Sequence, residues 1–198
     1  AEKALQKVNT ETVAAKFEGD KAQVTVDQNT VDKLVAKLDS IVETAKALND
    51  VMKSNKVEAK VEAVLEIKVA PEKAVEKVEA QIPAALLEKA AENKIDKVAI
   101  DAGVAKISIS PDTFKATGNQ TVQLAASKVE QSTLPDAVRS TVGNNPVFNF
   151  SAKVGENSVS RFEKPVEISI PYSPKPGEDP RKITVFFVND SGQLSNVI

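Results

Sequence analysis

The chain contains no histidine, no cysteine and no tryptophan, and it has one methionine and one tyrosine in 198 residues. Histidine is the side chain that most often transfers protons near neutral pH, so its absence excludes a Ser-His-Asp triad and related chemistry. Without histidine and cysteine there is also no zinc site of the usual nitrogen and sulfur type and no disulfide bond. We therefore expect no catalytic residue, no cofactor and no metal.

The charges exclude further classes of partner. Lysine and arginine number 26, aspartate and glutamate 28, and the two signs are interspersed. No basic block is present, which argues against a nucleic-acid partner, and no apolar run is long enough to span a membrane.

The chain begins at Ala1 without an initiator methionine or a signal peptide, so we expect a processed or excised piece of a longer protein.

The first half of the chain alternates between strand and helix patterns. Residues 1–9 fit the end of an upstream helix or linker, a hairpin is expected over residues 13–26, and a turn over residues 70–73. Two stretches, VTVDQNTVDKLVAKL and VEAQIPAALLEKAAENK, each read as a strand and then a helix, followed by an alternating strand. This echo predicts two tandem strand-helix-strand units.

The clearest helix signal is an apolar stripe at 3.6-residue spacing from Val31 to Met52. Asn29 or Thr30 is expected to cap this helix, and Asn55 to end it. Strict alternation of apolar and polar residues then predicts a strand over Val57–Val69. We expect the odd-numbered residues of this strand to be buried against the helix, because the apolar face of each element needs a partner.

After Pro111 the pattern changes to short strands separated by turns, and most of the prolines lie in the last quarter of the chain. Phe148 and Phe150 alternate with polar residues, and Phe187 follows Ile183 and Val185 at strand spacing, so we expect the three phenylalanines to be major contributors to the core. The run Asn189–Gly192 predicts a hairpin turn.

Together these patterns predict an α+β fold. Strand-helix-strand units in residues 1–110 are expected to pack with a Greek-key-like β-sandwich in residues 111–198. Since no disulfide is possible and no metal is expected, the burial of apolar side chains must stabilise the fold.

Only Tyr172 is a candidate ligand contact. Sugar-binding faces usually need exposed aromatic rings, and aromatic residues make up 4% of the chain. Tyr172 lies in the corner Ile170-Pro171-Tyr172-Ser173-Pro174, where its ring is either exposed to a ligand or its hydroxyl bonds to the backbone. The turns that hold Glu178, Asp179, Asn189 and Asp190 are rich in oxygen, but no calcium-loop motif is present and turn chemistry accounts for these residues.

Several stretches resemble a known family when they are taken together: Ile82–Ala90, Ile95–Pro111, Phe162–Tyr172, Lys175–Pro180 and Val185–Gly192. They resemble the extracellular module that precedes S-layer homology repeats in secreted and surface-anchored proteins of Firmicutes, including cellulosome-associated ones. The last three stretches are also loosely similar to ZU5/UPA-like β-modules, some of which self-cleave at a His-Phe-Ser site.

The resemblance implies a non-catalytic structural or interaction module of a bacterial cell-surface or secreted multidomain protein, located outside the cell. Its implied partners are neighbouring modules of the parent protein and cell-wall or other surface proteins. Two alternatives stay open: a carbohydrate-binding module for wall or biomass polysaccharide, and a fragment of a self-processing β-module. Against the last, Asn149-Phe150-Ser151 lacks the histidine and lies in a different strand. The S-layer repeats are also absent, so wall anchoring is not assigned to this chain.

Overall fold

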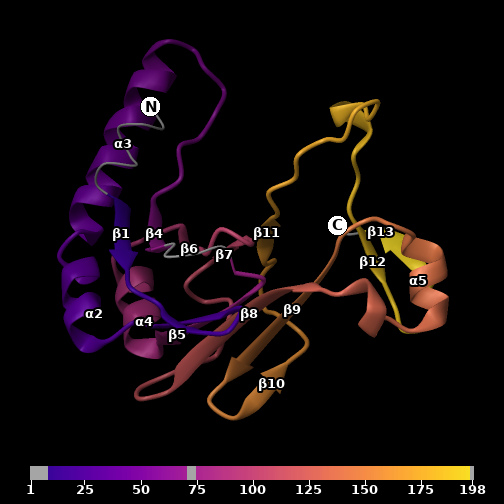
Figure 1. The fold of residues 1–198 in the computed structure, drawn as a ribbon. Coiled ribbons are helices and arrows are strands. Elements are labelled where there is room, and N and C mark those ends of the chain that lie inside the picture. Colours follow the sequence, from indigo (N-terminus) through magenta and orange to yellow (C-terminus); the bar gives the residue numbers. More distant parts are fainter. Residues whose placement is uncertain (1–8, 71–74, 197–198) are drawn as a thin grey trace.

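The computed structural model describes residues 9–70 and 75–196 (Figure 1). The expected helix or linker end at residues 1–9 and the expected turn at residues 70–73 therefore lie almost entirely outside the described residues. Within these residues, the strands form a five-stranded, a six-stranded and a two-stranded sheet. The five-stranded sheet has the order β1 (Thr10–Val13), β4 (Val64–Val69), β6 (Lys97–Asp101), β7 (Lys106–Ile109) and β11 (Glu167–Ser169). The six-stranded sheet has the order β10 (Asn157–Val159), β9 (Val147–Val154), β8 (Thr121–Val129), β5 (Lys77–Pro83), β3 (Lys21–Thr25) and β2 (Lys16–Glu18).

Two strand-helix-strand units follow one another, as the echo in the sequence predicts. The first runs from β3 through α2 (Gln28–Val35) and α3 (Leu38–Ser54) to β4, and the second from β5 through α4 (Ala84–Glu92) to β6. Corresponding strands are parallel neighbours, because β3 pairs with β5 in one sheet and β4 pairs with β6 in the other. The helices α2 and α4 also contact each other. Each unit therefore contributes one strand to each of the two larger sheets.

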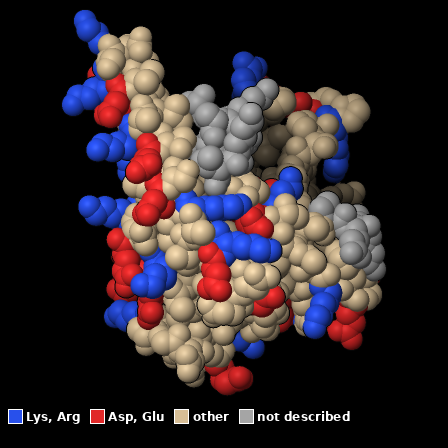
Figure 2. Space-filling view, turned by 90° about the vertical axis from the view of Figure 1, so that its left-hand side faces the viewer, with Lys and Arg blue, Asp and Glu red and all other residues tan. Residues whose placement is uncertain are grey.

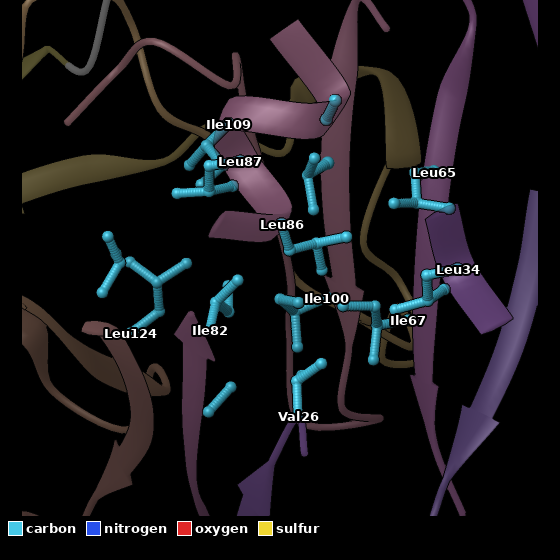
Figure 3. Close-up of a cluster of buried hydrophobic side chains, with 14 of the residues drawn as sticks. Val26, Leu34, Leu65, Ile67, Ile82, Leu86, Leu87, Ile100, Ile109 and Leu124 are labelled. Atoms are coloured by element: carbon cyan, nitrogen blue, oxygen red, sulfur yellow. The ribbon is translucent and has the colours of Figure 1, made fainter. Parts of the chain in front are cut away.

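The two larger sheets share one apolar core with the helices. Side chains of β4 and β6 meet those of β5 and β8, and α2 and α4 add their apolar faces to the same cluster. A void of only about 10 Å³ between the sheets, next to Ala80, Ile100 and Leu124, is about the size of one water probe. The core is therefore closely filled. Residues that are at most 2% exposed include Leu34, Leu65, Ile67, Ile82, Leu86 and Ile100 (Figure 3).

The expectation of one continuous helix over Val31–Met52 is wrong, because α2 and α3 are separated by a turn that ends at Lys37. The apolar stripe nevertheless continues from one helix to the other, and it includes the buried Leu34 and Leu38. From the turn, the Lys37 ammonium donates a hydrogen bond to the Thr10 carbonyl of β1 over 3.0 Å. This hydrogen bond links the turn between the two helices to the first strand.

The C-terminal end of α3 agrees with the sequence prediction, whereas the N-terminal cap of α2 differs from it. Asp27 is the cap of α2, since its Oδ1 accepts the Thr30 N–H at 2.8 Å. The expected caps Asn29 and Thr30 are wrong, because the helix already begins at Gln28 and both residues lie in its first turn. Asn55 ends α3 as predicted.

The expected burial on β4 is confirmed. Leu65, Ile67 and Val69 are at most 6% exposed, and α3 contacts the strand. The strand begins at Val64, however, and Val57 is 48% exposed, so the prediction of a strand over the whole of residues 57–69 is wrong. The reason is that ladder pairing with β6 starts only at Val64.

Just before β4, side chains from other parts of the chain bond to the backbone of Val61 and Ala63. The Asn49 amide of α3 donates to the Val61 carbonyl at 2.9 Å and accepts the Val61 N–H at 2.7 Å. The Asp96 carboxylate accepts the Ala63 N–H at 2.8 Å and an ammonium hydrogen bond from Lys60 at the same distance. These bonds satisfy backbone groups that have no ladder partner.

The three phenylalanines have different environments. Phe148 and Phe150 on β9 are half-buried and stack with their ring centroids 6.5 Å apart. Phe187 is 60% exposed, so the expectation that it lies in the core is wrong. It belongs to β12 (Phe186–Val188), which pairs with β13 (Leu194–Asn196) in the two-stranded sheet and adds no strand to either larger sheet.

The α+β class is confirmed, and strands from both sides of residue 110 share the larger sheets. From the later part, β8, β9 and β10 extend the six-stranded sheet from β5, whereas β11 extends the five-stranded sheet from β7. The division into residues 1–110 and 111–198 stays a prediction. Its two parts are joined through the pairing of β5 with β8 and of β7 with β11.

We expect Leu65→Ala to lower the free energy of unfolding by about 2–5 kcal/mol, because truncation of a fully buried leucine leaves a cavity. Phe187→Ala should change it by no more than about 0.5 kcal/mol, as is usual for an exposed position. Urea denaturation of both variants tests this. Equal losses would contradict the placement of Phe187 outside the core.

Candidate functional site

Exposed apolar side chains concentrate near the C-terminal end of the chain. Among the described residues, ten large apolar side chains are exposed, and eight of them lie between Phe162 and Leu194. Scattered apolar residues are ordinary on a protein surface, whereas a contiguous group marks a site of interaction. Five of the eight belong to β12, β13 and the residues just before β12; we call them the apolar hairpin. They are 43–60% exposed: Ile183, Val185, Phe186, Phe187 and Leu194.

The turn between β12 and β13 is the one predicted from Asn189–Gly192. The Gly192 N–H donates to the Asn189 carbonyl at 2.9 Å, and the Asn189 N–H donates to the Gln193 carbonyl at 3.1 Å. The Asn189 side-chain oxygen also accepts the N–H groups of Ser191 and Gln193. Gly192 has a φ of 80°, a left-handed conformation that favours glycine in hairpins of this kind.

The turn rests on the short helix α5 (Asp136–Val142). The Thr141 hydroxyl donates to the Gly192 carbonyl at 3.0 Å, and Val138 on the same helix is buried. A Cβ atom on Gly192 would lie 2.6 Å from the Ala137 carbonyl oxygen, so the close contact also requires glycine. The turn end of the hairpin is therefore fixed, although its apolar side chains stay exposed.

The outer edge of β12 has no neighbouring strand among the described residues. The Asn189–Gln193 bond places the ladder bonds to β13 on odd-numbered residues of β12, such as Phe187. The backbone groups of Phe186 and Val188 therefore point away from β13. The run ITVFFV over residues 183–188 contains no charge, proline or glycine. A free, uncharged edge of this composition favours pairing with another strand.

Tyr172 lies outside the apolar hairpin and is 36% exposed. Its hydroxyl donates to Glu178 Oε2 at 2.8 Å, and the same oxygen accepts the Lys175 N–H at 2.8 Å. The backbone N–H of Lys175 and then the Tyr172 hydroxyl lower the pKa of the Glu178 carboxyl, and the hydrogen bond to Glu178 raises the pKa of Tyr172. The hydroxyl thus closes a proline-rich corner. Its partner is a side chain, not the backbone expected from the sequence. A ligand contact by the ring stays a prediction.

Of the other residues considered for calcium, Asp179 and Asn189 are engaged in their own turns. Both carboxylate oxygens of Asp179 lie 3.0 Å from guanidinium nitrogens of Arg181, and this contact lowers the pKa of Asp179. Asn189 serves the hairpin turn. In the described part of the chain, no group of three or more acidic residues is placed to hold a metal ion.

A shallow hollow of about 650 Å³ lies at one end of the six-stranded sheet, where the β2–β3 turn meets the start of β5 and the end of β8. Its lining mixes acidic and basic residues, among them Asp20, Lys77 and Glu130, and Lys128 pairs there with Glu76 at 3.4 Å. None of its described lining residues is aromatic. The described lining of the hollow therefore offers no ring on which a sugar could stack.

The face that carries α2 and α3 has a different character from the hairpin. Figure 2 shows lysines and acidic residues interspersed over it, without a patch of one sign. Opposite charges pair in several places on the protein, as Lys60 does with Asp96 and Lys97 with Glu62, both at 2.8 Å. Within residues 9–70 and 75–196, no helix combines the length and apolar character needed to cross a membrane.

No family model, no curated protein and no solved structure matches this chain.

The apolar hairpin was missed as a candidate site because alternation assigned it to the core. One signal in the sequence distinguishes it. Phe186 and Phe187 are adjacent, so both faces of β12 carry an aromatic ring, which a half-buried strand does not need.

The single tyrosine and the absence of tryptophan allow a direct test of the Tyr172 corner. Absorbance at 295 nm should report a phenol midpoint above the ordinary value of 10.0, because a carboxylate beside the hydroxyl disfavours the phenolate. Glu178→Gln should lower that midpoint, whereas Asp179→Asn should leave it unchanged. A midpoint that Glu178→Gln does not move would contradict the contact.

Proposed function

We propose that this chain is a non-catalytic interaction module that docks other protein modules through the apolar hairpin. The observation that carries the proposal is the concentration of exposed apolar side chains on a hairpin whose outer edge has no neighbouring strand within residues 9–70 and 75–196. Edges of this kind bind partners by adding a strand, with backbone hydrogen bonds for affinity and side chains for specificity. The resemblance to modules that precede S-layer homology repeats supports a place on the bacterial cell surface, in a secreted multidomain protein.

The composition supports the same proposal. The chain has no histidine or cysteine for acid-base or nucleophilic chemistry. Its charges are mixed over the face in Figure 2, which suits solubility. The expected partners are neighbouring modules of the parent protein or other surface and cell-wall proteins. Binding to wall or biomass polysaccharide is the second candidate, favoured by the partly exposed ring of Tyr172.

Hydrogen–deuterium exchange tests the docking proposal. We expect the amides of residues 183–196 to exchange more slowly in the full-length parent protein than in a dilute solution of this chain alone, because a docked partner covers the hairpin. Residues 38–54 of α3 serve as the internal control and should exchange equally in both. Equal exchange at the hairpin would overturn docking to a neighbouring module.

Retention on insoluble cellulose, xylan and purified cell wall separates the two candidates. The docking proposal predicts that the chain stays in the supernatant with each polysaccharide. Clear retention that is lost in Tyr172→Ala but kept in Tyr172→Phe would replace it with the carbohydrate-binding function, because Tyr172→Phe removes the hydroxyl contact and keeps a ring for stacking. Phe162→Ala is the matched control, since this ring is also exposed but packs edge-to-face against Phe114, with the centroids 5.6 Å apart.

A further inference from the structure

We propose that a second copy of this chain pairs with the outer edge of β12, antiparallel and about a twofold axis. The two hairpins would then form one four-stranded sheet in the order β13, β12, β12 and β13. This inference rests on the proposed docking function and specifies the partner. It is argued from the backbone alternation, the charges at the two ends of the strand and the apolar side chains between them.

The alternation of the backbone restricts the register of such a pair. Even-numbered residues of β12 direct their N–H and C=O groups away from β13. We extend this alternation to Thr184, two residues before the strand. In an antiparallel ladder, two residues that exchange both hydrogen bonds must each direct these groups toward the other strand. One twofold register that satisfies this pairs Phe186 with Phe186 of the second copy and Thr184 with Val188.

The charges at the ends of the strand select this register. Lys182 ends the 3₁₀ helix Pro180–Lys182 just before the uncharged run, and Asp190 lies in the turn just after it. The register brings these two ends of the paired strands together, so that Lys182 lies near Asp190 of the second copy, and symmetry repeats the pair at the other end. Neither side chain has an ion-pair partner among the described residues, and both are exposed. A slip by two residues places Lys182 opposite the apolar Val188 or opposite Gly192. The charges at the two ends of the strand in one copy are therefore complementary to those in the second copy.

Apolar contacts accompany the backbone pairing. Phe186, Val188 and Leu194 lie on one face of the hairpin, because Val188 pairs directly with Leu194. The proposed register brings the two Phe186 rings opposite each other on that face, and aromatic cross-strand pairs are favourable. A partner strand with charges in its middle would leave them against these side chains. A second copy has no charge there.

Sedimentation of the whole chain over a range of concentrations tests self-association. The mass should rise from 21.1 kDa at low concentration toward twice that value, 42.2 kDa, at high concentration. A single strand pair is a small interface, so we expect a reversible dimer rather than a permanent one. A constant monomer mass at every concentration would overturn the proposal.

A charge swap tests the register. Lys182→Glu and Asp190→Lys should each weaken dimerisation about tenfold, because each variant creates two like-charged contacts across the twofold axis. The double variant restores opposite charges and should recover most of the wild-type affinity. Lys46→Glu on α3 makes the same charge change far along the chain from the hairpin and should have no effect. Single variants that leave the affinity unchanged, or a double variant as weak as the singles, would contradict this register.

Amide exchange distinguishes failure of this inference from failure of the proposed function. In the dimer, the amides of Phe186 and Val188 should slow with concentration, whereas that of Phe187, already bonded to β13, should not. A monomeric chain whose hairpin is still protected in the parent protein would overturn the second copy and retain docking to another module. Absence of protection in both experiments would overturn both proposals.

Discussion

Burial of one apolar core between two sheets is the constraint on which the rest of the structure depends. Each tandem unit sends one strand to each sheet, so the core closes only when β3, β4, β5 and β6 are all in place. With no cysteine, no covalent link supports this arrangement. Charges stay at its outside and pair there, as Lys106 of β7 does with Glu66 of β4 across β6, at 2.6 Å. Such pairs add little stability beside the burial.

Structural features that depend only on residues close together in the sequence were predictable from its patterns. Leu65 and Ile67 are buried because alternation and a neighbouring apolar helix suffice to place them. The start of β4 was not predictable, since it depends on where β6 begins to pair and on Asn49, which lies on a different element. Alternation showed that β12 is a strand. It could not show whether another layer covers Phe187, because that depends on the arrangement of distant elements.

In the candidate site, too, local features were predictable from the sequence, whereas contacts between separate elements were not. The exposure of the Tyr172 ring was predictable from the prolines around it, but its hydroxyl partner Glu178 follows from the path of a six-residue corner. The hairpin turn was predictable from Asn189 and Gly192. Its support by α5 was not, because the Thr141 contact joins residues 51 positions apart. The structure of this region therefore depends on contacts between separate elements more than on the elements themselves.

The parallel pairing of the tandem units also has a consequence for synthesis of the chain. Thr10 of β1 pairs with Glu66 of β4, and Lys21 of β3 pairs with Lys77 of β5. In both cases 56 positions in the sequence separate a residue from its partner on the parallel strand. Non-local pairing of this kind slows folding, because a long loop must close before any contact rewards it. On the ribosome, β1 and β3 emerge well before β4 and β5. The nascent chain therefore exposes β1 without its partner β4, and β3 with only β2 beside it, and this interval is when it is most open to misassociation.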